Sequence, residues 1–331
     1  MHLPKNIKSI IIFRALQLGD TLCAVPAIRA LRHAYPCAII TLAGMPWAAS
    51  FTERFNKYFD DFIWFPGYPG LPEQELNPAA FTEFLSIVQN RKFDLAIQLQ
   101  GNGSIVNPMI KLFGAKITAG YFKKEAYAPN RDYFMEYPDY GSEIDRHLLL
   151  MDFLGVPPQG NNLEFPVTDQ DQKDLESLGL GIKSKKYICI HPGSRGAWRQ
   201  WPVAHFAAIA DYYAEAGFQI VVTGTKAEQD LVESVIAHMH YPAINAAGKT
   251  NLSAMAILIR DACALVSNCT GVSHIAAAFQ TPSIVISMDG EPERWGPINK
   301  HLHKTINWLL EPGFDYVLNQ AALLLHPVNK V

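Results

Sequence analysis

The run Tyr-Ile-Cys-Ile-His-Pro-Gly-Ser-Arg-Gly-Ala-Trp-Arg-Gln-Trp-Pro, residues 187–202, decides the fold class of this chain. Its apolar start, Tyr187 to Ile190, predicts a buried strand, and Pro202 is typical of the first position of a helix. The loop between them holds two glycines and two arginines. Because a helix start leaves backbone N–H groups unpaired, a strand, loop and helix in this order can hold a phosphate. An ordinary connection from strand to helix would look the same locally.

The same order of elements recurs at the N-terminus and near residue 270. Ser9 to Ala15 predicts a buried strand and Leu16 to Asp20 a turn, and the following helix, with Thr21 as its expected cap, ends at Pro36. Asn268 to His274 is a third loop that follows a strand and enters a helix. This alternation predicts an α/β protein with two doubly wound parallel sheets, whose ligands bind beyond the carboxyl ends of the strands.

The length of 331 residues is comfortable for two domains. Gly155 to Pro166, which is rich in proline, glycine and asparagine, is the expected linker. We therefore place an N-terminal domain at residues 1–160 and a C-terminal domain at residues 161–331, with a last helix that could pack back on the first domain. Residues 122–142 are expected to form a long aromatic loop. Two such domains facing each other would form one central cleft.

The composition excludes several classes of protein. Apolar residues make up 49% and charged residues 18%, as in globular proteins, and the net charge of −3 argues against a general nucleic-acid binder. Five cysteines form no Cys-x-x-Cys pair, and no His, Cys and Asp cluster has metal-ligand spacing, so we expect neither a disulfide framework nor a metal site. No segment is suited to be a signal peptide or a membrane span. We expect a cytoplasmic monomer that could still contact a membrane surface peripherally.

The first loop offers two charged side chains. Asp20 stands at the start of a helix beside Gly19, where a carboxylate commonly caps the helix. If it faces the cleft, it could instead accept a proton from an attacking hydroxyl. Arg14, at the end of the preceding strand, needs either a carboxylate partner or an anionic ligand such as a phosphate or a charged acceptor.

The second loop supplies Ser194, Arg195 and Arg199, and hydroxyl, N–H and guanidinium donors are what a diphosphate requires. It matches neither Walker A, nor a nucleophile elbow, nor the Gly-x-Gly-x-x-Gly of a dinucleotide fold. Positive charge from arginines and helix starts would offset a leaving diphosphate without a metal ion.

The third loop, with Thr270 and Gly271, brings small residues and N–H donors to a helix start and suits a phosphate or a sugar. His274 follows in the same helix, where it could equally bond a neighbouring backbone group. Glu291 and Glu293, in a polar loop after the last expected strand, could hold ribose hydroxyls or could be solvated charges.

At these three loops the chain resembles the glycosyltransferase family 9 proteins, the heptosyltransferase family of lipopolysaccharide synthesis. The first likeness is Leu18-Gly-Asp-Thr-Leu-Cys-Ala-Val-Pro-Ala-Ile-Arg-Ala-Leu-Arg32. The second is His191-Pro-Gly-Ser194 with Arg199-Gln-Trp-Pro202. The third is Thr270-Gly-Val-Ser-His274 with Ala276-Ala-Ala278. The likeness covers most of the chain, and the three motifs occur in the order that the family has.

The resemblance implies a GT-B fold in which the first domain binds mainly the acceptor and the second binds a nucleotide-sugar donor. It implies an inverting, metal-independent transfer. We expect a lipopolysaccharide-type or other glycan or glycolipid acceptor and no cofactor. Peripheral contact with the inner membrane stays open, because an acceptor in a lipid layer would require only a surface patch. Asp20 matches the proposed general base, Arg199 the position of a family lysine near the donor phosphates, and Ser194 a hydroxyl contact to them. The residues that match the donor loop are Thr270, Gly271 and His274.

Cys269 departs from the family pattern, which has Asp at this position in contact with sugar hydroxyls. A thiol is a poor hydrogen-bond acceptor for a polyol, so Cys269 cannot replace the contact that the family's Asp makes with the sugar, and the identity of the sugar stays open. The resemblance itself implies heptose or a related sugar, with ADP-heptose as one candidate donor. Two other classes of function stay open. One is a GT-B-like sugar-nucleotide epimerase or hydrolase that works without an acceptor. The other is a non-catalytic nucleotide-sugar-binding protein, which Cys269 would favour if it marks a decayed donor site.

Overall fold

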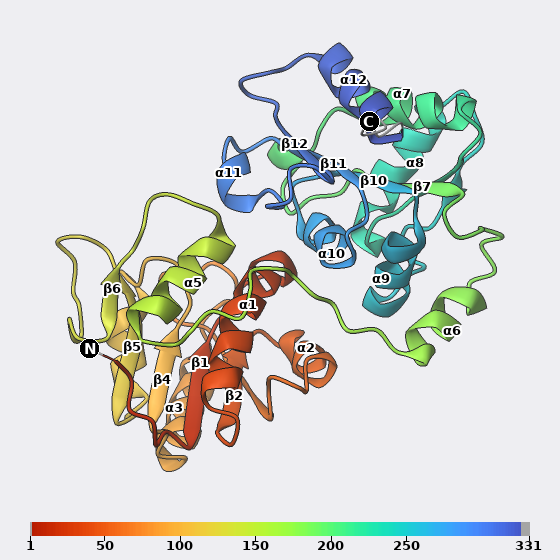
Figure 1. The fold of residues 1–331 in the computed structure, drawn as a ribbon. Helices are drawn as coiled ribbons and strands as arrows, with labels where there is room; N and C mark the ends of the chain where they lie inside the picture. Colours follow the sequence, from red (N-terminus) through yellow and green to blue (C-terminus); the bar gives the residue numbers. More distant parts are fainter. Residues whose placement is uncertain (1, 326–331) are drawn as a thin grey trace. The chain divides into compact units, whose positions relative to one another are not determined.

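The structure is a computed structural model, and the part of the chain that it describes comprises residues 2–325. The chain divides after Asn162 into two compact units (Figure 1). Each unit has its own six-stranded sheet, in which every pair of neighbouring strands is parallel. The predicted α/β class with two doubly wound parallel sheets is confirmed. The division lies close to the boundary expected between residues 160 and 161.

The first unit has the strand order β3-β2-β1-β4-β5-β6, so the direction of winding reverses between β1 and β4. Its elements are β1 (Ser9–Phe13), α1 (Leu18–Ala34), β2 (Ile39–Gly44), α2 (Ala48–Arg54), β3 (Asp61–Trp64), α3 (Pro78–Asn90), β4 (Leu95–Gln98), α4 (Val106–Leu112), β5 (Ile117–Phe122), β6 (Phe134–Glu136) and α5 (Glu143–Phe153). At the reversal, Phe13 pairs with Gln98, so the segments that follow β1 and β4 begin side by side.

Helices cover both faces of this sheet, which explains why β1 is an unbroken apolar run rather than an alternating one. On one face, Phe13 meets Phe65 and Phe113 edge to face, with ring centroids 4.8 and 6.1 Å apart. On the other face, Ile12 lines a small apolar space with Ile28 of α1 and other residues of the sheet and of α5. Burial from both sides fixes β1 at the centre of the unit.

Two local expectations for this unit were wrong. Thr21 does not cap α1, because the helix begins at Leu18 with Gln17 as its N-cap residue, and the Thr21 hydroxyl donates to the Gln17 carbonyl at 3.0 Å. The region 122–142 is not entirely a loop, because it contains β6, which pairs with β5 and buries Phe134. A strand of three residues is too short to show a period in the sequence.

The second unit has the strand order β12-β11-β10-β7-β8-β9, and its winding reverses between β10 and β7. Its helices and strands are α6 (Asp169–Ser177), β7 (Tyr187–His191), α7 (Val203–Glu215), β8 (Gln219–Val222), α8 (Gln229–His238), β9 (Ile244–Asn245), α9 (Leu252–Asp261), β10 (Ala264–Asn268), α10 (Gly271–Phe279), β11 (Ser283–Ser287), α11 (Pro292–Trp295), β12 (His303–Asn307) and α12 (Phe314–Leu325), with short 3-10 turns at Ala197–Arg199 and Lys226–Glu228. At the reversal, Ser267 pairs with His191.

The last helix, α12, packs on the sheet of its own unit. Val317 and Ala321 are fully buried in the core of the second unit. The Tyr213 hydroxyl of α7 donates to the Ala321 carbonyl at 3.4 Å. These contacts make α12 one of the helices that cover the second sheet.

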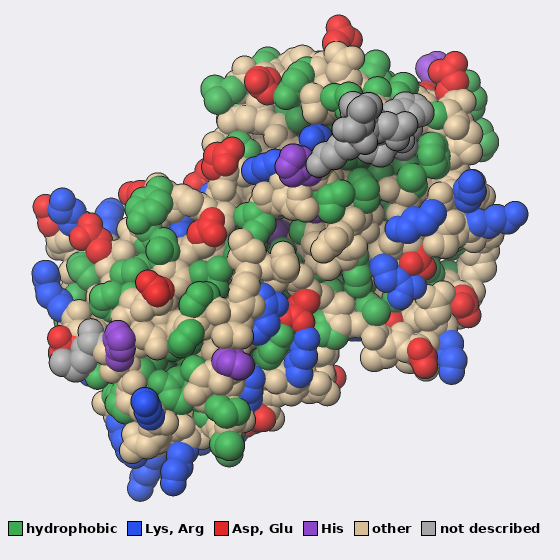
Figure 2. Space-filling model, in the orientation of Figure 1, with side chains coloured by type: hydrophobic (Ala, Val, Ile, Leu, Met, Phe, Trp, Pro, Cys, Tyr) green, Lys and Arg blue, Asp and Glu red, His purple; other side chains and the backbone are tan. Residues whose placement is uncertain are grey.

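The surface carries charges of both signs. On the face drawn in Figure 2, Lys and Arg side chains are scattered among Asp and Glu side chains on both units. This mixture agrees with the small net charge of −3. Across residues 2–325, none of the helices has the length and apolar character needed to cross a membrane.

Candidate functional site

The second and third predicted loops meet at the sheet reversal of the second unit. Asn268, the last residue of β10, is completely buried. Its Nδ2 donates to the carbonyls of Pro192 (2.7 Å) and Gly193 (3.3 Å), and its Oδ1 accepts from the backbone N–H of Trp201 (2.9 Å). One side chain therefore ties both ends of the loop after β7 to the end of β10. The sequence placed Asn268 at the start of the third loop, but nothing in the sequence indicated its bonds to the loop after β7.

The loop after β7 carries the predicted residues Ser194 and Arg199. The Gln200 amide donates to the Ser194 carbonyl at 3.3 Å, which folds the loop on itself. Arg199 is the last residue of a 3-10 turn, and its guanidinium pairs with Asp289 and lies 5.4 Å from the Trp198 ring. Both Ser194 and Arg199 are half-buried, whereas Arg195 is exposed.

Gly193 lies directly beside the Glu228 side chain. A Cβ at position 193 would overlap the Glu228 carboxylate. That carboxylate accepts from the backbone N–H and the hydroxyl of Thr225, at 2.8 and 2.9 Å, so a larger residue at position 193 would have to displace it from these bonds. Burial lowers the pKa of His191, against the opposing charge of Glu228, and the ring bonds the Thr223 hydroxyl at 3.0 Å. The His191 imidazole is consequently neutral, and it links the end of β7 to the residue that follows β8.

The third loop enters α10 with its backbone donors oriented along the helix. Thr270 is the N-cap residue, with an extended backbone, and Gly271 is the first helical residue. The N–H groups of the first turn of α10 therefore lie close to the end of β10. The Thr270 carbonyl accepts from both the backbone and the hydroxyl of Ser273, at 3.0 and 2.7 Å. His274 is buried in the same helix. This is the geometry in which a helix start attracts an anion.

Cys269 presents a neutral thiol in this loop. It is 6% exposed, and its backbone N–H donates to the Ile286 carbonyl at 2.8 Å. Burial, assisted by the nearby charge of Asp289, raises the pKa of its thiol to about 12. At neutral pH the position therefore offers no charged acceptor.

The two predicted glutamates belong to the segment that follows β11. Glu291 precedes α11, and its carboxylate pairs with Arg294 at 3.3 Å and accepts from the Trp295 indole at 3.2 Å. Glu293 is exposed on the same short helix. The Glu291 carboxylate is thus bonded to two residues of α11, although half of the Glu291 side chain remains exposed.

In the first unit, Arg14 has the carboxylate partner that its burial requires. Its Nε and Nη2 donate to the Asp20 carbonyl, its Nη1 donates to the Leu99 carbonyl, and Nη2 lies 3.7 Å from Glu143 Oε1. The side chains of Arg14 and Glu143 are 0% and 2% exposed. This guanidinium therefore joins the ends of β1 and β4, the start of α1 and the start of α5.

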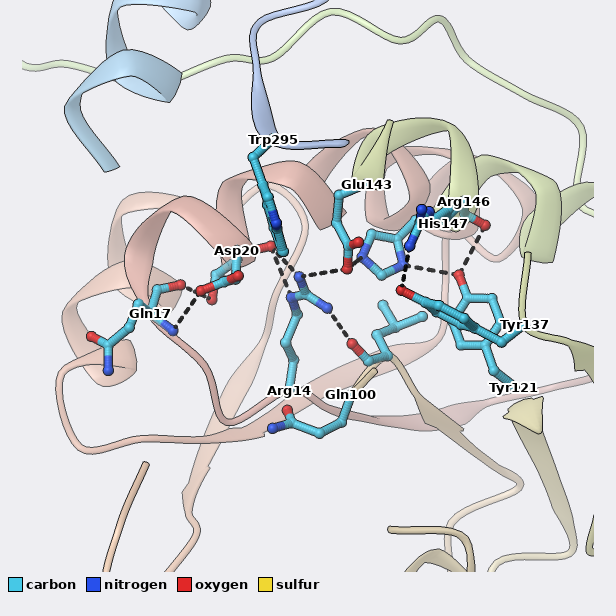
Figure 3. A network of polar contacts seen from close by, with 12 residues as sticks. Arg14, Gln17, Asp20, Gln100, Tyr121, Tyr137, Glu143, Arg146, His147 and Trp295 are labelled. Atoms are coloured by element: carbon cyan, nitrogen blue, oxygen red, sulfur yellow. Dashed lines mark hydrogen bonds and ion pairs between the residues drawn. The ribbon is translucent and has the colours of Figure 1, made fainter. Parts of the chain in front are cut away.

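A chain of polar groups continues from Glu143 along α5 (Figure 3). His147 Nε2 lies 3.6 Å from Glu143 Oε1, and its Nδ1 lies 3.0 Å from the Tyr121 hydroxyl. That hydroxyl also bonds the Arg146 carbonyl at 2.9 Å, and Arg146 donates to the Tyr137 hydroxyl at the same distance. Burial raises the pKa of Tyr121 well above its ordinary value, so the phenol keeps its proton.

Asp20 occupies the third position of α1 and points to the helix start (Figure 3). Its Oδ2 accepts from the backbone N–H of Gln17 at 3.2 Å, which is the capping contact that a first-turn acid usually makes. The residue is half-buried rather than enclosed.

The structure thus places Asp20 and Arg14 at the reversal of the first sheet, and the remaining predicted site residues around the loops of the second unit. Among residues 2–325, no group of three or more His, Cys, Asp or Glu side chains is arranged to hold a metal ion.

Two doubly wound parallel units, each with polar loops at its sheet reversal, place the protein in the GT-B class of glycosyltransferase folds. The sequence model of glycosyltransferase family 9 (heptosyltransferase) matches residues 82–314, and the chain belongs to this family. It is accordingly an enzyme of the glycosyltransferase class.

Individual proteins agree with this assignment. The chain is 28% identical over 227 residues to lipooligosaccharide heptosyltransferase 2 of Haemophilus ducreyi, an alignment that spans 63% of this chain and 64% of that protein. It is 24% identical over 311 residues to the lipopolysaccharide core heptosyltransferase OpsX of Haemophilus influenzae, covering 88% and 82% of the two chains. A crystal structure of a family 9 glycosyltransferase from Veillonella parvula superposes with a TM-score of 0.81 at 20% identity, over 98% of this chain and 99% of that one.

Proposed function

We propose that this protein is an inverting, metal-independent glycosyltransferase that moves a heptose or a related sugar from a nucleoside-diphosphate sugar to a lipopolysaccharide-type acceptor. The acceptor is a glycan or a glycolipid, and the protein uses no cofactor. The proposal takes its substrate class from the relatives, which are named as heptosyltransferases of lipopolysaccharide or lipooligosaccharide.

One observation carries the donor half of this proposal: Asn268 brings the Ser194 and Arg199 loop and the start of α10 to one point of the second sheet. Parallel sheets bind their ligands at this reversal of winding. A guanidinium, a hydroxyl and helix-start N–H groups can together stabilise the negative charge that develops on a leaving diphosphate. We therefore assign the diphosphate to Ser194, Arg199, Thr270 and Gly271, and the rest of the donor to the residues beside them, which are Cys269, His274, Glu291 and Glu293.

Asp20 is the base that we propose for the acceptor half. The acceptor hydroxyl oxygen attacks the anomeric carbon, its proton passes to the Asp20 carboxylate, and the bond from that carbon to the diphosphate breaks. A single displacement of this kind inverts the configuration at the anomeric carbon. Arg14, by contrast, is paired inside the first unit with Glu143 and two carbonyls, and we assign it the task of holding the α1 start in place.

The substitution Asp20→Asn tests the base directly. Asparagine keeps an oxygen that can accept from the Gln17 N–H, so the helix cap should survive while the proton acceptor is lost. We expect turnover to fall by about 10²–10⁴-fold, the usual contribution of a general base. Binding of the nucleoside diphosphate should stay within experimental error, as measured by isothermal titration calorimetry.

Asp145 provides the matched control, because it has the same position and contact at the start of α5. Its carboxylate accepts from the backbone N–H of Ser142 at 3.3 Å. Asp145→Asn should leave turnover unchanged. If Asp20→Asn were as active as the wild type, or if both variants lost activity equally, Asp20 would be a capping residue and not a base.

The class of reaction is tested with the wild-type protein. With ADP-, GDP- and UDP-sugars and a lipopolysaccharide-type acceptor, the product should have the inverted anomeric configuration by NMR, and a chelator should not reduce the rate. Fast release of free sugar or of an epimer without acceptor would show a hydrolase or epimerase instead.

We also propose that the protein acts as a cytoplasmic monomer with peripheral membrane contact. Light scattering would test the monomer, and sedimentation with vesicles would test the membrane contact.

A further inference from the structure

Asp289, in the segment between β11 and α11, is a buried carboxylate to which the proposed reaction assigns no part. Its Oδ1 accepts from the Ser287 hydroxyl at 2.7 Å and from the backbone N–H of Glu291 at 3.3 Å. Its Oδ2 pairs with the Arg199 guanidinium. The Asp289 side chain is 8% exposed and that of Arg199 is 26% exposed. The Asp289 carboxylate is therefore the more buried partner of the pair, and the Arg199 guanidinium is the more exposed one.

Asp289 is charged at neutral pH. Burial alone would raise the pKa of its carboxyl group, but the Ser287 hydroxyl, the charge of Arg199 and the Glu291 N–H outweigh burial and bring the pKa below its ordinary value. The contact with Arg199 is consequently a full ion pair. It joins the loop after β7 to the loop after β11, which are 90 residues apart in the sequence.

The backbone around Arg199 is already held, so the ion pair acts on the head group of the side chain. The backbone N–H groups of Arg199 and Gln200 donate to the carbonyls of Gly196 and Ala197 at 2.9 and 3.0 Å, and the Trp201 N–H donates to Oδ1 of Asn268, the residue that ends β10. The Trp198 ring lies 5.4 Å from the guanidinium carbon. A guanidinium has five N–H donors, so pairing with one carboxylate oxygen leaves donors for a phosphate.

We propose that Asp289 is a positioning residue of the donor site, which holds the Arg199 guanidinium in the orientation in which it binds the diphosphate of a nucleoside-diphosphate ligand. This inference rests on the proposed function, which supplies the ligand class. A free arginine side chain loses rotamer freedom when it binds, whereas one already held by a fixed carboxylate has lost that freedom on folding. The Asp289 carboxylate thereby raises the affinity for a diphosphate without touching it.

A double-mutant cycle tests the inference on the full-length chain. The wild type, Arg199→Ala, Asp289→Asn and the double variant are titrated by calorimetry with ADP, GDP and UDP, and with the corresponding nucleosides. We expect Asp289→Asn to weaken binding of the best diphosphate roughly tenfold, within the range of coupling between residues in contact. In the Arg199→Ala background the same change should have no effect. Binding of the nucleoside, which has no phosphate, should be equal in all four proteins.

The control variant is Asp61→Asn, which removes the acid from an exposed Arg–Asp pair of the first unit, where Arg91 and Asp61 are 40% and 39% exposed. It should leave diphosphate binding unchanged. Asp289 would have no positioning role if its substitution left diphosphate affinity unchanged, weakened it equally in both backgrounds, or weakened nucleoside binding to the same extent. If the wild type bound no nucleoside diphosphate, the proposed donor site would fail as well. Binding by the wild type without coupling would overturn the role of Asp289 alone.

Discussion

Two arginines at comparable strand ends have different surroundings. Arg14 follows β1 directly and is 1% exposed, and it bonds the Asp20 and Leu99 carbonyls and pairs with Glu143, which belong to the first unit. Arg199 stands several residues beyond β7 on a turn, and 26% of its side chain is exposed. The sequence left open whether Arg14 has a carboxylate partner or a ligand. Glu143 supplies the carboxylate, and it is 129 residues away, so only the folded chain could reveal the pair.

The pair of Arg14 and Glu143 makes a stability prediction. Glu143→Gln keeps the shape of the side chain but leaves the buried guanidinium without its counter-charge. Breaking one side of a buried pair typically costs about 3–5 kcal/mol, so the free energy of unfolding of the first unit should fall by that amount. Denaturant unfolding followed by circular dichroism measures it.

The exposed pair of Arg91 and Asp61 is the reference for this measurement. Asp61→Asn should change stability by at most about 1 kcal/mol, as is usual for surface pairs. If Glu143→Gln were as mild as Asp61→Asn, the network around Arg14 would not contribute to the stability of the unit.

At the scale of elements, the sequence predicted the strongly patterned ones and missed β6 and β12. The apolar runs of β1 and β7 identify them as central strands. By contrast, β12 reads His-Lys-Thr-Ile-Asn and has no apolar run or clean alternation. It is a strand because β11 lies beside it, with Ser283 paired to His303. The His303 ring bonds the Ser283 hydroxyl at 2.8 Å.

This strand predicts a pH dependence of stability. Burial, together with the nearby charge of Lys300, lowers the pKa of His303 to about 4, whereas an unfolded histidine titrates near 6.5. The unfolded state therefore binds a proton that the native state does not. The contribution of His303 to stability is fully present above about pH 6.5 and is lost as the pH falls towards 4, with a slope of up to about 1.4 kcal/mol per pH unit.

Denaturant unfolding between pH 7 and pH 4 measures this slope. His303→Gln keeps a neutral hydrogen-bonding side chain. This substitution should reduce the slope by up to about 1.4 kcal/mol per pH unit, the contribution of one titrating proton. His301 is exposed in the same segment, so His301→Gln should leave the slope unchanged. An identical pH dependence in the wild type and in His303→Gln would show that the strand does not sense pH through this ring.

At the scale of the whole molecule, each unit has its own sheet and its own buried core. The residues assigned to the donor all belong to the second unit. The fragment 163–331, produced alone, should therefore unfold cooperatively and bind the nucleoside diphosphate with an affinity close to that of the full chain. It should have no transferase activity, because Asp20 is absent.

Calorimetry and circular dichroism on this fragment test the prediction, with the fragment 1–162 as the control that should not bind nucleotide. A folded second fragment without nucleotide binding would mean that the donor needs residues of the first unit. A fragment that does not fold would mean that the two units are not independent.

The α/β class, the two-domain division and the three loops follow from local features of the sequence. Apolar runs, helical spacing, glycines and prolines act on neighbouring residues, so they can be recognised without a fold. The contacts that build the site are of another kind. Asn268 reaches residues 192, 193 and 201, and Asp289 reaches Arg199, because parallel strands distant in sequence end at the same edge of a sheet. Partners of buried polar groups depend on that long-range order, and only the tertiary structure could identify them.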